Sequence, residues 1–246
     1  EAKKLGMPAL ALTDHGTMFG VIEFYRACKQ EGINPLIGLE GYMAPRGMAD
    51  RDSQKDSKPA HVLLLAENQA GYQNLLKIAS ASQLEGFYYK PRIDHDFLAS
   101  HAEGLICTTG CMASEVPRAL AADNPQAAAR LLDYYYQVFG PERFFFELQD
   151  HEIPELRRLN GKLLELGPRY RANFVATNDV HYIRSDDFAL HDVLLCIQTA
   201  ALLSDANRMR MTDNSYYLRS PDEMRRLFGE VPGAIEMIPL VDGRVK

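Results

Sequence analysis

The sequence has no tryptophan, no CxxC cysteine pair and no long apolar run. The missing tryptophan excludes nothing. No apolar run approaches the roughly 20 residues that a membrane-spanning helix needs, and no segment has the pattern of a signal peptide, so we expect no role at a membrane. The four cysteines are spread over a chain of 246 residues. This usage predicts reduced thiols in a cytoplasmic protein rather than a disulfide framework.

A surplus of positive charge is also missing. The chain has 27 basic and 33 acidic residues, which gives a formal net charge of −6. This balance argues against a phosphate-binding face built on bulk charge, although a local basic groove is compatible with it. Hydrophobic residues make up 46% of the sequence, which is enough for a full core in one large domain or two small ones.

Continuous apolar runs alternate with helical patterns along most of the chain. Six runs are predicted as strands: Ala9–Thr13, Pro35–Met43, His61–Ala66, Gly104–Thr109, Arg143–Leu148 and Asn173–Thr177. Because these runs are apolar throughout, both faces of each strand are expected to be covered. Between them, apolar residues recur at helical spacing, as in 21–28, 72–79 and 156–166. The alternation predicts an α/β fold with a parallel sheet, open or closed into a barrel.

Local signals divide the chain further. Gly32 and the pair Gly167-Pro168 predict helix ends just before the next strands. The polar stretch 45–59 predicts a solvated loop. After residue 182 the alternation stops, and 188–197 and 221–228 carry helical patterns without a new strand. We therefore expect one domain over residues 1–185 and a mainly helical connecting segment over 186–246.

Side chains that bind metals follow or interrupt most of the predicted strands. The candidates are Asp14 and His15 after the first strand, Glu40 within the second, Cys111 after the fourth, Asp150 and His151 after the fifth, and Asn178, Asp179 and His181 after the sixth. In parallel α/β folds, ligands gather at the carboxyl ends of strands. Imidazole, thiolate and carboxylate groups that converge there suit divalent ions, and two such ions would clamp a phosphate. His61 differs because it opens the third strand instead of ending it.

Each candidate also has an ordinary structural interpretation. A single histidine near a strand is more often hydrogen-bonded structure than a metal ligand. Asp14 is either the cap of the following helix or a support that orients His15, and Cys111 taken alone is typical of a small buried side chain. A buried carboxylate at Glu40 is harder to explain, because it needs a cation or a hydrogen-bond partner. The shared placement at strand ends favours a metal centre.

Several stretches resemble a known family. They are ALTDHGTMFGVIEFYRACKQEGINPLIGLEGYMAP, HVLLLAENQAGYQNLLKIASASQLEGFYYKPRID, GLICTTGCMASEVPRAL and FVATNDVHY. They resemble the PHP (polymerase and histidinol phosphatase) family, and within it the N-terminal domain of the alpha subunits of bacterial DNA polymerase III. The stretch GYQNLLKIAS…EGFYYKPRID is similar to that polymerase branch in particular. The tail LHDVLLCIQTAALLSDANRMRM resembles the segment that leads toward the polymerase palm.

The resemblance implies a seven-stranded α/β barrel with as many as three divalent ions (Zn, Mn or Mg) at the strand ends. The family ligands match His15, Glu40 as a bridging carboxylate, His61, Cys111, Asp179 and His181. Asp14, His151 and Asn178 rank below these six. His61 enters the ligand set through the resemblance alone.

The sequence departs from the family pattern at both ends. The family's opening HxH strand and nearby aspartate are missing, and the chain opens on EAKKLGMP, which is typical of the end of a helix. We therefore expect a fragment that begins inside the fold, with an incomplete barrel and an incomplete metal cluster. The last residues, EVPGAIEMIPLVDGRVK, do not match the family either. The palm carboxylates of a polymerase are not expected in this chain.

Three functions are compatible with these patterns. The domain is a metal-dependent phosphoesterase, such as a 3′–5′ exonuclease or a pyrophosphatase, or it is a metal-stabilised scaffold in a replicative polymerase. A free-standing PHP phosphatase is the third reading. The resemblance implies contact with DNA through the parent polymerase, and with replicase subunits such as the proofreading exonuclease and the sliding clamp. The aromatic residues Phe87, Tyr88 and Tyr89 either form a contact surface for a partner or cover a helix.

Overall fold

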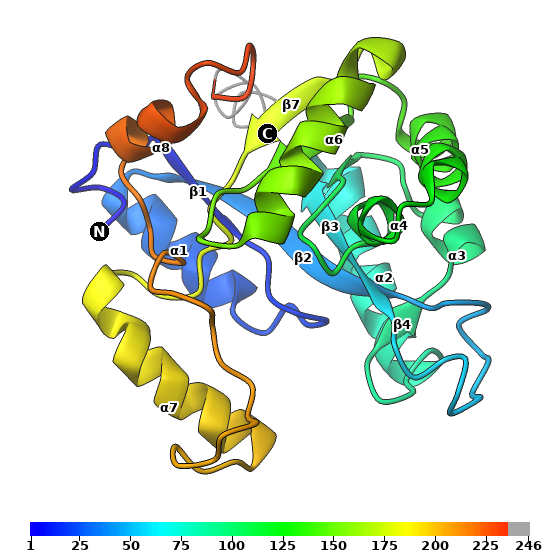
Figure 1. Cartoon of the computed structure of the whole chain (residues 1–246), viewed down its shortest axis with the longest axis horizontal. Helices are drawn as coiled ribbons and strands as arrows, with labels where there is room; N and C mark the ends of the chain where they lie inside the picture. The colour runs from blue at the N-terminus through cyan, green and yellow to red at the C-terminus, as the bar shows by residue number, and fades with distance from the viewer. Residues whose placement is uncertain (236–246) are drawn as a thin grey trace.

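The protein folds around one curled sheet that helices cover on its outer side (Figure 1). The structure is a computed structural model, and it describes residues 1–235. The strands are β1 (Ala9–Leu12), β2 (Asn34–Met43), β3 (Ala60–Ala66), β4 (Arg92–Ile93), β5 (Leu105–Thr108), β6 (Phe144–Leu148) and β7 (Asn173–Ala176). All six predicted strands are confirmed to within one residue at each end. Sequence analysis missed β4, since two residues carry no periodic pattern.

The prediction that all strands are parallel is wrong for β3. The strand order is β1-β2-β3-β5-β6-β7, and β4 pairs with β2. Strand β3 runs antiparallel to both β2 and β5, whereas the other pairs are parallel. No helix lies between β2 and β3, and without a crossover helix the chain returns in the opposite direction. The start of β3 therefore lies at the same edge as the carboxyl end of β2.

The helices are α1 (Val21–Glu31), α2 (Gln69–Leu84), α3 (His95–Ser100), α4 (Glu115–Ala121), α5 (Pro125–Phe139), α6 (Pro154–Tyr170), α7 (Phe188–Thr199) and α8 (Pro221–Phe228), with a 3-10 turn at Ser185–Asp187. Five helices, α1, α2, α6, α7 and α8, lie where apolar spacing predicted them, and the sequence analysis did not predict α3, α4 and α5. Gly32 ends α1 in the left-handed conformation, as predicted. The end predicted at Gly167-Pro168 is wrong, because α6 continues to Tyr170 and closes on the left-handed Arg171. Gly167 is instead a packing position beneath the Phe174 ring.

The two faces of the sheet bury different side chains. The outer face joins the helices in the main core, which contains Leu64, Leu75, Leu132, Phe144 and Leu159 among others. The inner face carries a smaller apolar cluster of Leu36, Leu65, Ile106, Phe145 and Val175. Since side chains on one face recur every second residue, the next inward positions along the strands are polar. Those positions include Thr108, Glu147 and Thr177, followed by the candidate metal ligands.

The stretch 45–59 is a loop but is not fully solvated, which corrects the sequence-based expectation. Asp56 is completely buried and pairs with Arg46. This hydrogen bond lowers the pKa of Asp56 to about 2. Arg92 is also completely buried and donates to four backbone carbonyls, those of Met48, Asp50, Asp56 and Gly86. The loop folds over this guanidinium, which no local pattern in 45–59 indicates.

The tail packs back on the domain only in part. Tyr182 pairs with Tyr217 in an isolated bridge, and α8 buries Met224 and Phe228. Helix α7 lies away from the sheet at the edge of the molecule (Figure 1). No helix among residues 1–235 is long and apolar enough to span a membrane. The domain boundary at 185/186 stays a prediction, and part of the departure expected at the end of the chain lies outside the described residues.

Candidate metal centre

Three side chains meet at the inner edge of the curled sheet. His15, Glu40 and His61 bring one ligand atom each to within 4.8 Å of one another. The Nδ1 atom of His61 lies 2.7 Å from Oε1 of Glu40, and the Nδ1 atom of His15 lies 3.5 Å from Oε2. Each carboxylate oxygen of Glu40 therefore faces a different imidazole.

The backbone beside His15 is tied to β2. Residue 15 forms a parallel bridge with residue 40, the amide of Glu40 donates to the Asp14 carbonyl at 3.1 Å, and the amide of Gly16 donates to the Glu40 carbonyl at 2.9 Å. Gly16 has a φ of 64°, and a Cβ there would lie 2.5 Å from Pro91. Only glycine fits this turn, which directs His15 toward Glu40.

The reversed direction of β3 explains the position of His61. Residue 61 pairs with Tyr42 near the carboxyl end of β2, and its amide donates to the Ala113 carbonyl at 3.0 Å. A histidine that opens an antiparallel strand occupies the same edge as residues that end parallel ones. The rule that looks only at strand ends therefore missed a residue that the resemblance had assigned.

Cys111 joins the group from the loop after β5. Its Sγ atom lies 3.5 Å from Nδ1 of His61 and 3.8 Å from Oε1 of Glu40. Burial, reinforced by the charge of Glu40, raises the pKa of the Cys111 thiol well above its usual range. Without a cation this cysteine is a neutral thiol, and only a bound metal would favour the thiolate.

Asp179 and His181 approach from the loop after β7. The His181 ring lies 6.3 Å from the His15 ring between centroids, and Nδ1 of His181 lies 2.7 Å from the carbonyl oxygen of Asp179. Burial raises the pKa of Asp179 to about 6, and the nearby charges of Glu40 and Glu147 act in the same direction. All six predicted ligands thus lie around one point, although only three form the compact group.

Electrostatics within the compact group favour the charged form of Glu40. Burial acts to raise the pKa of Glu40, but the hydrogen bond with His61 and the charges of His15 and His61 outweigh it, so the pKa is lowered. Burial lowers the pKa of His15, and the charges of His61, His181 and Lys90 add to this effect against Glu40. A carboxylate with unprotonated imidazole nitrogens is the form that binds a divalent cation.

Comparison of the sequence with known proteins assigns the chain to a family. The profile of the PHP domain matches residues 1–151, which is more than half of the chain. The chain belongs to the PHP domain family. It is also similar to DNA polymerase III alpha subunits: 42% identical over 237 residues to that of Borreliella burgdorferi, 43% over 225 to that of Thermus aquaticus and 40% over 261 to that of Mycobacterium tuberculosis H37Rv.

These matches cover 96%, 91% and 100% of this chain but only 21%, 18% and 22% of the relatives. The chain therefore spans about a fifth of the relatives' length. Among solved structures, a candidate metal-dependent phosphoesterase from Bifidobacterium adolescentis aligns over 72% of this chain and 78% of its own, with a TM-score of 0.35 and 14% identity. That likeness is too distant to bear on activity.

The lower-ranked candidates Asp14, His151 and Asn178 lie outside the compact group of His15, Glu40 and His61. His151 stacks on Tyr216 with ring centroids 3.8 Å apart, and its Nδ1 atom lies 2.6 Å from the Ser215 hydroxyl. Asn178 donates to the backbone carbonyls of Ser215 and Tyr217 at 2.8 and 2.7 Å. Both side chains hold segment 215–217 of the tail against the domain. The Asp14 carboxylate lies beside Gly20, at the start of α1.

Sequence analysis overlooked Glu147, a buried carboxylate in β6. It accepts hydrogen bonds from the side chains of Thr108, Thr177 and Gln149. Burial raises the pKa of Glu147. The hydrogen bonds from the three donors oppose this effect, and the charge of Glu40 adds to it. The signal was present, because an acidic residue interrupts the apolar run FFFEL as Glu40 interrupts the second strand.

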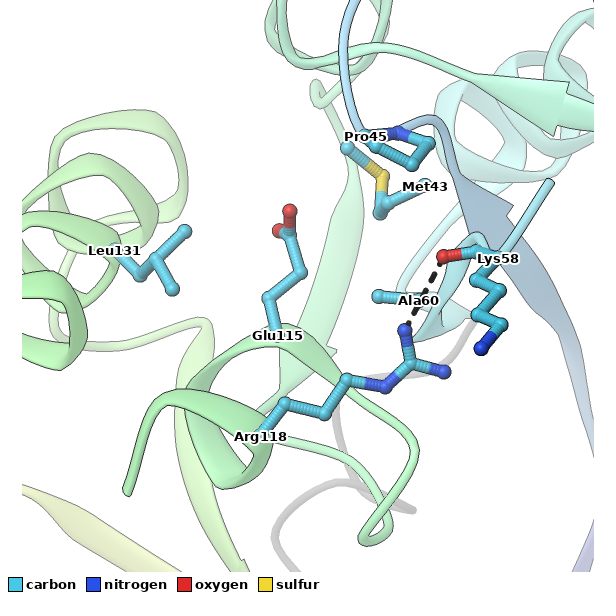
Figure 2. Close-up of a pocket in the computed structure, with 7 residues that line it drawn as sticks. All are labelled: Met43, Pro45, Lys58, Ala60, Glu115, Arg118 and Leu131. Atoms are coloured by element: carbon cyan, nitrogen blue, oxygen red, sulfur yellow. Dashed lines mark hydrogen bonds between the residues drawn. The ribbon is translucent and has the colours of Figure 1, made fainter. Parts of the chain in front are cut away.

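A separate hollow of about 240 Å³ lies on the opposite face of β2 and β3 (Figure 2). Met43 and Ala60 line it, one residue beyond Tyr42 and before His61, so their side chains point away from the metal centre. Figure 2 shows Arg118 reaching from α4 to the backbone carbonyl of Lys58. The hollow contains no part of the candidate centre.

Proposed function

We propose that this chain is the PHP domain of a bacterial replicative DNA polymerase alpha subunit, and that it binds divalent metal ions and hydrolyses phosphoesters. The observation that carries the proposal is the convergence of His15 and His61 on the two oxygens of Glu40. The parent subunit would act in the cytoplasm on DNA, together with a proofreading exonuclease and a sliding clamp. Nucleotidyl transfer would belong to other parts of that subunit.

The donor set fits a divalent ion. Imidazole nitrogens and carboxylate oxygens are common ligands of Zn²⁺ and Mn²⁺, and a carboxylate that faces two imidazoles through separate oxygens is arranged to bridge two ions. Glu40 is 9% exposed, so its charge is costly without a cation. Cys111, Asp179 and His181 are proposed as additional ligands around this group.

In hydrolysis, the residues of this chain would hold the metal, orient its ligands and exclude water. A bound divalent ion supplies Lewis acidity toward a phosphoryl oxygen. The hydrogen bond from Nδ1 of His181 to the Asp179 carbonyl orients the ring and leaves Nε2 free to bind. The apolar cluster of Leu36, Ile106 and Phe145 on the inner face of the sheet would exclude water from the side of the centre that it covers.

The substrate class would be a 3′ nucleotide end or pyrophosphate. The test uses the full-length alpha subunit with its polymerase activity abolished, assayed for 3′-end and pyrophosphate hydrolysis with Zn²⁺, Mn²⁺ and Mg²⁺. Glu40→Gln is expected to lose bound metal and at least a hundredfold in hydrolysis. The matched control is Glu31→Gln, which removes an exposed ion pair with Lys3.

Two results separate the alternatives. Hydrolysis that is absent from the parent, or unchanged by Glu40→Gln, contradicts the enzymatic proposal. Glu40→Gln that lowers metal content and melting temperature with no hydrolysis to lose would favour the metal-stabilised scaffold. Identity of about 40% along nearly the whole chain favours the polymerase subunit over a free-standing phosphatase.

A further inference from the structure

Lys90 presents a charged ammonium group beside the metal centre. Its side chain is exposed, and among residues 1–235 its Nζ atom has no carboxylate partner in an ion pair. The Nζ atom lies over the ring of Tyr42, 5.5 Å from the centroid. A cation over an aromatic face is held in place but keeps its donors available to a ligand.

Tyr42 links this ammonium group to the centre. Its ring stacks with His15 at 6.1 Å between centroids and meets His61 edge-on at 5.2 Å. The lysine, the tyrosine and the two histidines thus form one continuous contact. An anion placed against the centre from the Lys90 side meets the ammonium first.

The turn that carries Lys90 is firmly anchored. The amide of Tyr88 donates to the Lys90 carbonyl at 3.0 Å, and Tyr89 between them has a φ of 59°. Pro91 packs on Gly16, next to His15. Two residues after Lys90, the buried Arg92 binds four backbone carbonyls and lies 5.2 Å from the centroid of the Tyr88 ring. This anchoring fixes the position from which Lys90 reaches the centre.

The charge balance explains what the lysine would do. Glu40 and Asp179 place acidic groups at the inner edge of the sheet, and these repel a phosphate ester unless cations offset them. Metal ions would neutralise the ligand carboxylates, but an oxygen of the substrate that points outward still needs a donor. An ammonium with three hydrogen-bond donors suits a phosphate oxygen.

We propose that Lys90 binds a non-bridging phosphate oxygen of the substrate at the mouth of the metal centre. This inference rests on the proposed function for the identity of the substrate. It assigns Lys90 to substrate positioning, separate from the metal ligands. The exposed pair of Lys29 and Tyr25 on α1 has the same 5.5 Å geometry but no metal ligand beside it, and it provides a matched control.

The test measures binding of inorganic phosphate to the full chain by titration calorimetry, with metal loaded and after chelation, alongside the metal content. Lys90→Met is expected to weaken phosphate binding roughly tenfold, as expected for the loss of one charge-assisted hydrogen bond, and to leave metal content unchanged. Lys90→Arg should restore binding to within about threefold of the parent. Lys29→Met should bind as the parent does. Circular dichroism checks that each variant folds.

The outcomes distinguish this inference from the function it rests on. Phosphate binding that depends on Lys90 supports the inference even if the parent holds no metal, in which case the proposed function fails by itself. Equal binding by the parent and Lys90→Met, or no binding by the parent in either state, overturns it. Loss of metal in Lys90→Met also overturns it, because the lysine would then support the centre.

Discussion

Two carboxylates buried inside the same curled sheet have opposite pKa shifts. Glu40 faces two imidazoles; the hydrogen bond with His61 and the charges of both rings together outweigh the cost of burial, so its pKa is lowered. Glu147 is held by neutral hydroxyl and amide donors, and burial keeps its pKa raised. Hydrogen bonds from neutral groups stabilise a charge less than a nearby cation does. The same sheet therefore carries one buried carboxyl group whose pKa is lowered and another whose pKa is raised.

His151 is the residue whose burial predicts a pH effect on stability. Burial lowers its pKa to about 4, against 6.5 in the unfolded chain. Because the unfolded chain takes up a proton that the folded state resists, stability is expected to fall as the pH drops from about 6.5 toward 4. We expect His151 to account for about 1–2 kcal/mol of the loss between pH 7 and pH 5. Urea unfolding of the parent and His151→Gln at both pH values measures it.

The stability loss between pH 7 and pH 5 must be compared between the parent and His151→Gln, because Asp179 titrates in the same pH range and has the opposite effect on stability. Its raised pKa means that the folded state binds a proton first, so this group adds stability as the pH falls toward 4. If His151→Gln loses as much stability between pH 7 and pH 5 as the parent does, His151 is not a neutral buried group.

Among the elements, strand position was predictable and strand direction was not. Apolar runs located six strands, but strand direction depends on the connection, and the 16 residues between β2 and β3 (44–59) give no periodic signal. His15, Glu40, Cys111, Asp179 and His181 follow from strand-end placement, whereas His61 needed the family resemblance. Lys90 and Arg92 were missed because their partners lie far away in the sequence, up to 48 residues for Lys90 and Tyr42.

Arg92 is expected to hold the elements around the centre together. Arg92→Met leaves four buried or half-buried carbonyls without their donor and removes the contact with Tyr88. We expect a loss of about 2–4 kcal/mol in the free energy of unfolding, measured by urea denaturation. Arg225→Met is the control, since Arg225 pairs with exposed Asp222 on α8, and it should change stability by less than about 0.5 kcal/mol. Equal effects in the two variants would refute the anchoring role.

At the scale of the whole molecule, helix α7 presents an exposed apolar face. Leu190, Leu194 and Ile197 are 67%, 61% and 72% exposed, and their spacing of four and three residues aligns them on one side of the helix. The loop after α7 adds Leu202 and Leu203, which are also exposed. Contiguous apolar surface of this kind promotes association in water.

We therefore expect the 246-residue chain to self-associate through α7 when it is isolated. The double variant Leu194→Gln, Ile197→Gln should shift the chain toward a monomer in light scattering at equal concentration, and its melting temperature should fall by no more than a few degrees because both side chains already contact water. Leu195→Gln is the matched control on the same helix: Leu195 is buried, so this change should destabilise the fold by about 2–4 kcal/mol. A parent chain that is monodisperse and monomeric, or a double variant that associates as the parent does, would show that α7 is not the surface responsible.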